Sequence, residues 1–147
     1  MFRSLSRASR RALTVATDGA RSTAELAMTS AVLNITFDCS DASAIARFWA
    51  AVTGWKMRQQ YFQPGQEEFS VGPARGSDIR LYFVSVPEPK TVKNRLHLDV
   101  VPRDGSQEEV ARLVRLGASV GADQPVGVGW VILADTEGNE FCVETGG

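Results

Sequence analysis

Residues 31–54, AVLNITFDCSDASAIARFWAAVTG, contain a strand, a helix start, a helix and a helix end in that order. The segment 31–39 is rich in β-branched and apolar residues with alternating polar positions, which predicts a strand. Ser40-Asp41 supplies an N-cap and Gly54 a C-cap. Between these caps, apolar residues recur at i, i+3, i+4 and i+7, which predicts one buried helix face made of Ile45, Phe48, Trp49 and Val52.

Three further strands are predicted after this helix, over residues 56–62, 67–71 and 79–86. A turn at Pro64-Gly65 separates the first two, because these residues favour tight turns. Pro87-Glu88-Pro89 ends the last strand, since proline has no N–H to donate to a ladder. The first half of the chain therefore has the element order βαβββ.

The second half follows the same order with one strand fewer, βαββ. A strand is predicted over 95–101, a helix up to Gly117 and strands over 126–134 and 140–144, the last two joined by a turn at 135–139. Gly127 and Gly129 weaken the start of the strand over 126–134. Ser106 and Glu109 form a capping box, because each side chain can satisfy a free backbone N–H of the helix start. The helix face is Val110, Leu113 and Val114, and Glu108 can pair with Arg112 at i, i+4.

A shift of 63 residues superposes the two halves, and it places Leu33 on Leu96, Asn34 on His97 and Gly54 on Gly117. Two such units predict two small sheets, each with a helix on one face, whose other faces curve around a shared cup. The expected fold class is α+β, with paired βαβββ modules over about 31–87 and 95–145 that form a half-open barrel. A cup of this kind is the natural place for a small ligand.

Charge divides the 147-residue chain into two parts. Residues 1–27 contain five arginines and two acids, whereas the whole chain has a formal net charge of −1. We expect 1–27 to be a basic, disordered tail, or a segment that is not translated if Met28 is the true start, and 28–147 to be a single domain. The near-neutral total and the lack of a recognisable motif argue against a nucleic-acid partner.

Cysteine content and hydropathy indicate the cellular compartment in which we expect the protein. Cys39 and Cys142 are too few for a disulfide scaffold and have no CxxC spacing. No apolar run approaches the ~20 residues that cross a bilayer, so we expect a cytoplasmic protein with no membrane partner.

Three stretches carry a resemblance to a known superfamily. They are 34–55, with RFW at 47–49 and GW at 54–55; HLDV at 97–100; and LADTEGNEFC at 133–142. Together with VPEPK at 86–90, their order and spacing resemble the vicinal oxygen chelate superfamily, and within it the glyoxalase-like and bleomycin-resistance-like proteins. The resemblance covers about 31–145 and implies the paired-module half-open barrel expected above.

Metal-using members of that superfamily take ligands from the first and last strands of each module. In this sequence the first position is Asn34, the third is His97 and the fourth is Cys142. The second position falls in the strand over 79–86, which contains no His, Glu or Asp. Three of the four positions therefore depart from the pattern. Strand alternation places Asp99 on the face of His97, and Glu144 on the face of Cys142.

Two functions follow from the resemblance. The first is metal-independent small-molecule binding, as in the drug-sequestering members, with no cofactor. The ligand-binding candidates are Asn34, Trp55, Tyr82, His97, Asp99, Trp130 and Cys142.

The alternative is a glyoxalase-like lyase or isomerase, or a dioxygenase-type enzyme, that uses a divalent metal. Glu144 would then be catalytic and would move a proton, and His97 and Glu144 would hold the metal. A homodimer is expected in either case, because members of the superfamily commonly pair modules between chains.

Overall fold

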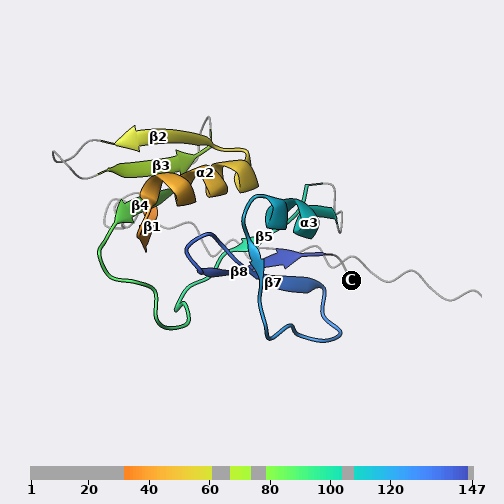
Figure 1. The fold of residues 1–147 in the computed structure, drawn as a ribbon. Coiled ribbons are helices and arrows are strands. Elements are labelled where there is room, and N and C mark those ends of the chain that lie inside the picture. Colours follow the sequence, from red (N-terminus) through yellow and green to blue (C-terminus); the bar gives the residue numbers. More distant parts are fainter. Residues whose placement is uncertain (1–31, 61–66, 74–78, 104–107, 146–147) are drawn as a thin grey trace, which may run out of the picture. The chain divides into compact units, whose positions relative to one another are not determined.

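The computed structural model describes residues 32–60, 67–73, 79–103 and 108–145 (Figure 1). Several sequence-based predictions lie outside these residues. They are the basic tail over 1–27 with the alternative start at Met28, the turn at Pro64-Gly65, and the Ser106 half of the capping box.

The first module contains five elements whose order matches the prediction. They are β1 (Asn34–Cys39), α2 (Ala42–Thr53), β2 (Lys56–Gln60), β3 (Glu68–Gly72) and β4 (Arg80–Ser85). The strands form one sheet in the order β1-β4-β3-β2, in which β1 runs parallel to β4 and the other pairs are antiparallel. Strand β1 is therefore an edge strand of this sheet.

The second module repeats this plan with β5 (Asp99–Val100), α3 (Glu108–Arg115), β6 (Ser119–Val120), β7 (Trp130–Ala134) and β8 (Glu140–Glu144). Its sheet has the order β5-β8-β7-β6, with β5 parallel to β8. The equivalent strand orders confirm the paired-module α+β fold. No strand pairing within the described residues joins the two sheets into a closed barrel.

Helix α2 has the ends that the sequence predicted. The carboxylate of Asp41 accepts a hydrogen bond from the backbone N–H of Ala44 at 2.8 Å, which satisfies a free donor of the first turn. Gly54 has a φ of 69°, a left-handed conformation that glycine adopts without steric cost, and its N–H donates to the carbonyl of Ala50 at 2.9 Å.

Helix α3 differs from its prediction in two respects. Val114, expected on the apolar face, is 42% exposed, and Leu113 is the residue of that face that is fully buried. The second difference is an ion pair. Arg112 pairs with Glu109 rather than with Glu108, through contacts of 2.6 Å from Nε and Nη2. The same guanidinium donates to the carbonyls of Ala51 and Val52 at the end of α2. Arg112 thus satisfies carbonyl groups that a helix end leaves without an intrahelical partner.

Two strand predictions were wrong in extent. The strand predicted over 95–101 is only Asp99–Val100, so His97 lies just before it. The strand predicted over 126–134 begins at Trp130, and Gly127 is in the left-handed region with a φ of 73°. A two-residue strand, β6, was not predicted, because its length is too short to show a period of two.

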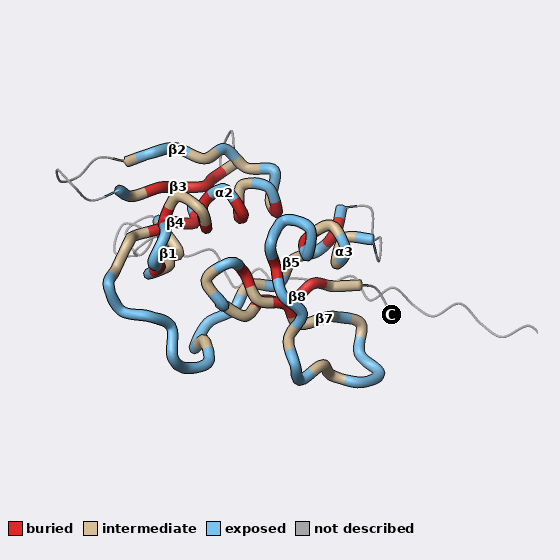
Figure 2. The backbone as a smooth tube through the Cα atoms, in the orientation of Figure 1, coloured by how far each residue is buried: buried red, intermediate tan, exposed pale blue. Residues whose placement is uncertain are grey.

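The core lies between α2 and the sheets, as the burial colours of Figure 2 show. Trp49 is 1% exposed and contacts rings from both modules: Phe37 of β1 at a centroid distance of 5.8 Å and Phe141 of β8 at 5.2 Å. This confirms the predicted buried face of the first helix. None of the helices in the described part of the chain is long and apolar enough to cross a membrane.

Candidate functional site

The candidate ligand residues lie mostly on the sheet faces that the helices do not cover. In β1 and β4, Phe37 and Phe83 contact each other on the core side, so their strand neighbours Asn34 and Tyr82 lie on the opposite face. In β8, Phe141 and Val143 are buried, so Cys142 and Glu144 lie on the opposite face. We call these the helix-free faces.

Three candidates meet on the helix-free face of the second module. One ligand atom from each of His97, Asp99 and Cys142 lies within 4.8 Å of the other two. The imidazole Nε2 of His97 is 3.5 Å from Oδ1 of Asp99. The pairing of β5 with β8 explains this proximity, because Asp99 is the register partner of Cys142. The backbone N–H of Cys142 also donates to the carbonyl of Leu98 at 2.9 Å.

Glu144 is not part of this group within the described residues. It shares the face of Cys142, as predicted, but residues two apart on a strand are separated by about 6–7 Å. The structure therefore brings His97, Asp99 and Cys142 close together, whereas the predicted metal pair of His97 and Glu144 stays a prediction. Asn34, at the other family position, lies in the sheet of the first module.

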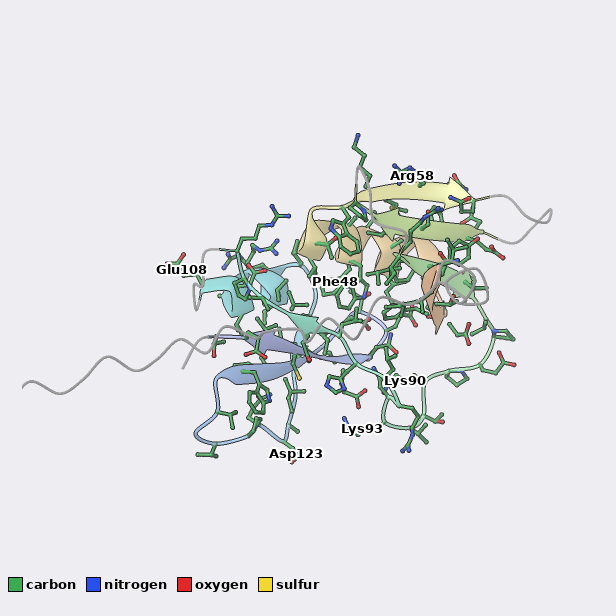
Figure 3. The ribbon with its side chains drawn as sticks, turned by 180° about the vertical axis from the view of Figure 1, so that it is seen from behind. Phe48, Arg58, Lys90, Lys93, Glu108 and Asp123 are labelled. Carbon is green, nitrogen blue, oxygen red and sulfur yellow. The ribbon has the colours of Figure 1, made fainter. Side chains whose placement is uncertain are left out.

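The surroundings of Cys142 keep its thiol protonated. Partial burial raises the pKa of this thiol, and the charge of Asp99, a hydrogen bond to Asp99 and the charge of Glu144 raise it further. Lys93, on the segment before β5 and labelled in Figure 3, acts in the opposite direction. The free thiol is therefore a poor nucleophile, since thiolate is the reactive form.

The first module presents two polar features on its helix-free face. The Oδ1 atom of Asn34 is buried, and no described group lies within hydrogen-bond distance of it. The hydroxyl of Tyr82 donates to Oε2 of Glu68 at 2.5 Å; burial and this carboxylate raise the pKa of Tyr82 to about 12. Asn34 can therefore accept a hydrogen bond from a ligand, whereas the Tyr82 proton already has an acceptor.

A cavity of about 850 Å³ lies between the modules on the side of the helices. Its walls are mostly apolar, and Glu109, Arg103 and Arg112 supply charged groups. Trp55 and Asp99 border this cavity, so two of the predicted ligand residues meet there, while Tyr82 and Trp130 are not among its lining residues. The apolar lining includes Ile35, Trp49, Val52, Leu81, Leu98 and Val100.

The turn at 135–139 has a structural role that the sequence did not reveal. Asp135 is 3% exposed, and its carboxylate accepts hydrogen bonds from the indole Nε1 of Trp49 at 3.1 Å and from Asn139. Glu137 accepts from the backbone N–H groups of Ser40 and Asp41 at 3.0 Å. These residues connect the second module to α2, and a turn motif read alone gives no signal of such distant partners.

Comparison with known proteins identifies a family with this architecture. A family model described as a glyoxalase-like domain matches residues 34–144. The chain belongs to the glyoxalase-like domain family. This family and the structural neighbours support membership of the vicinal oxygen chelate superfamily. A search of curated proteins finds none that matches the chain.

Solved structures share the fold at low identity. The fosfomycin resistance protein FosX from Mesorhizobium loti is 18% identical, with a TM-score of 0.60 over 82% of this chain and 94% of that one. TnmS3, an antibiotic-binding protein from Streptomyces, is 22% identical, with a TM-score of 0.55 over 79% and 95%. A FosX mutant from Listeria monocytogenes, complexed with Mn(II) and a dihydroxypropylphosphonic acid, is 14% identical, with a TM-score of 0.58 over 82% and 95%.

The donor atoms present suit one kind of metal better than another. Mn(II), as in the Listeria neighbour, prefers carboxylate, carbonyl and water oxygens, whereas the group here offers one imidazole, one carboxylate and one thiol. A thiol and an imidazole suit a softer ion such as Zn²⁺. The residues of this chain therefore fit a divalent metal, but not the hard ligand set of an Mn(II) site.

Proposed function

We propose that this domain binds a small organic molecule in the cavity between its modules. The observation that carries the proposal is the cavity itself, whose volume of about 850 Å³ and apolar walls fit a ligand of drug size. Trp55 borders it and offers an indole on which a planar molecule can pack. The antibiotic-binding neighbour TnmS3 supports the same class of function.

The chain provides a matched pair of tryptophans for the test. Trp55 lines the cavity, while Trp130 is 40% exposed on β7 and is absent from the cavity lining. A thermal-shift screen of aromatic metabolites and antibiotics first finds a ligand, because a molecule that binds only the native state raises the melting temperature. We expect Trp55→Ala to weaken binding of that ligand by about 10-fold or more, and Trp130→Ala to leave it within about 2-fold, by isothermal titration calorimetry.

The opposite pattern of binding losses would place the ligand outside the cavity. If Trp130→Ala or His97→Ala abolished binding while Trp55→Ala did not, the ligand would lie on the helix-free faces, beside Asn34, His97 and Glu144. Trp55→Phe keeps an aromatic wall, so it separates loss of contact from loss of folding.

An enzyme is the second candidate, and the grouping of His97, Asp99 and Cys142 is the observation that favours it. A divalent metal would supply Lewis-acid polarisation to a glyoxalase-like lyase or isomerase reaction, or to a dioxygenase-type reaction. Glu144 would carry the proton, as a carboxylate on the same face. Turnover that is lost in Glu144→Gln while the melting temperature is kept would support this role.

The sequence-based expectation of metal-independent binding rests on the departure of three family ligand positions, and it stays a prediction. We also propose a cytoplasmic homodimer. The edge positions of β1 and β5 in their sheets support the dimer.

A further inference from the structure

The charged side chains that border the cavity leave one positive charge without a partner. They are Asp99, Arg103, Glu109 and Arg112. We infer that the cavity binds an anionic aromatic molecule of the aromatic carboxylate class, whose acidic group pairs with Arg103. This inference rests on the proposed function and adds to it the charge of the ligand and the residue that selects for that charge.

The guanidinium of Arg112 is occupied by protein groups. Its Nε and Nη2 donate to the two carboxylate oxygens of Glu109 at 2.6 Å each, and the same side chain donates to the carbonyls of Ala51 and Val52. The Glu109 side chain is only 15% exposed. This ion pair therefore connects α3 to the end of α2 and adds no net charge to the cavity.

The carboxylate of Asp99 lies on the other face of its sheet. In the β5–β8 pair, Asp99 is the register partner of Cys142, and Val100 is the partner of the buried Val143. Side chains alternate along a strand, so Val100 lies on the side of the cavity and the Asp99 side chain on the helix-free face. There its Oδ1 is 3.5 Å from Nε2 of His97. The negative charge of Asp99 is thus directed away from the cavity.

Arg103 is the charge that remains. It is exposed in the turn after β5, and no carboxylate of the described residues forms an ion pair with it. The neighbouring wall includes Leu98, Val100 and Pro102, and apolar surroundings strengthen an ionic attraction by lowering the local dielectric constant. A guanidinium can also bind a carboxylate through two parallel hydrogen bonds.

Trp55 adds a hydrogen-bond donor to the same cavity. Among the described residues its indole N–H has no acceptor, whereas the indole N–H of Trp49 donates to Asp135 at 3.1 Å. An indole that packs against other groups usually finds a partner for its N–H. The polar groups left for a ligand are therefore donors and a cation, which favour an anion with acceptor oxygens over a cationic aromatic molecule.

The test uses two probes that differ in charge and hardly in shape, 2-naphthoate and its neutral carboxamide, titrated into the full chain by isothermal titration calorimetry. We expect the wild type to bind the carboxylate at least about 5-fold more tightly than the amide. Arg103→Gln should reduce this preference below about 2-fold, and Arg103→Glu should reverse it. Arg103 is exposed, so both variants should keep the melting temperature of the wild type.

Arg58 provides the matched control. It is an exposed arginine of β2, labelled in Figure 3, and it is absent from the cavity lining. Its neighbour Met57 packs against the core, so Arg58 lies on the helix-free face. Arg58→Gln removes the same charge as Arg103→Gln, and it should leave the preference for the carboxylate unchanged.

The possible outcomes separate this inference from the proposed function. Equal binding of the two probes, or a preference that survives Arg103→Gln, overturns the inference. If Trp55→Ala still weakens both probes in that case, binding in the cavity stands. If neither probe binds but the thermal-shift screen yields an uncharged ligand that requires Trp55, the inference alone fails. If no compound binds, or Trp55→Ala has no effect on binding, the proposed function fails with it.

Discussion

The buried side chain of Asp135 connects the closing turn to the core. Its buried carboxylate accepts hydrogen bonds from the indole of Trp49, from the backbone N–H groups of Glu137 and Asn139, and from the Asn139 amide. Removing this acceptor would leave the buried indole N–H of Trp49 and several partly buried donors without their partner. A buried polar group without a partner costs the full desolvation penalty.

We therefore expect Asp135→Ala to lower the free energy of unfolding by about 3 kcal/mol, measured by urea denaturation. Asp123 is the matched control; it is exposed in the loop before β7 and is labelled in Figure 3. Asp123→Ala should change the free energy of unfolding by less than about 0.5 kcal/mol.

Trp49→Phe provides a milder test of the same bond. It keeps an aromatic ring in the core but removes the indole N–H, so we expect it to cost less than Asp135→Ala and the two effects to be non-additive in the double variant. Strict additivity would mean that the Trp49–Asp135 hydrogen bond contributes nothing to stability.

Sequence reasoning at the level of single residues named side chains that the structure brings together, but it did not predict their distances. Strand alternation placed Asp99 with His97 and Glu144 with Cys142, since alternation follows from a period of two. It could not tell that Asp99 and Cys142 would be register partners, because register depends on how β5 pairs with β8. Asp99 therefore joined the group and Glu144 did not.

At the scale of elements, Glu137 works as an external cap of helix α2. Its carboxylate accepts from the N–H groups of Ser40 and Asp41 and from the Ser40 hydroxyl at 2.7 Å. Partial burial acts to raise the pKa of Glu137, but the hydrogen bonds from Ser40 and Asp41 outweigh it and hold the pKa below its ordinary value of 4.5. A negative charge near a helix N-terminus is also favoured by the helix dipole.

A lowered pKa makes this cap pH-dependent. The folded state binds the proton more weakly than the unfolded state, so the contribution of Glu137 is fully present above about pH 4.5 and is lost as the pH falls through the folded pKa. We expect Glu137→Gln to be less stable than the wild type at pH 7, and the difference to shrink as the pH falls below 4.5. Urea denaturation at a series of pH values measures it.

The control removes an equivalent charge from an exposed site. Glu88→Gln, between two prolines on the segment that leaves β4, takes away one carboxylate that is exposed. If Glu137→Gln and Glu88→Gln gave the same difference from the wild type at every pH, the cap would contribute no stability.

Elements with local end signals were the ones that the sequence predicted well. Helix α2 runs from Ala42 to Thr53 between the expected caps, Asp41 and Gly54, because both caps act within one turn. Strands β5 and β6 are two residues long, and their extent depends on pairing with β8 and β7 rather than on their own composition. Such strands carry no periodic pattern from which to predict them.

At the scale of the whole molecule, the repeat places β1 and β5 at equivalent edges of the two sheets. No pairing joins these two strands within the described residues. Apolar side chains stand exposed beside these edges, including Leu33, Ile79, Leu96 and Val101. An open strand edge with apolar neighbours promotes association unless something covers it.

A second copy of the chain can cover both edges at once. If β1 of one copy lies beside β5 of its partner, twofold symmetry repeats the contact, and each paired edge joins a first module to a second. The apolar residues at the edges would then leave water. Ile79 and Val101 also border the cavity, so such a dimer would cover part of its mouth.

A lysine introduced beside the β5 edge should therefore weaken the contact between the two copies of the chain. We expect Val101→Lys, at a valine that is 71% exposed beside β5, to shift the proposed dimer towards monomer in sedimentation equilibrium. Val126→Lys is the control, because this valine is 96% exposed in the loop between β6 and β7, at the opposite edge of the same sheet, and it should leave the dimer intact. A monomeric wild type, or equal dissociation by both variants, would place the contact elsewhere or remove it.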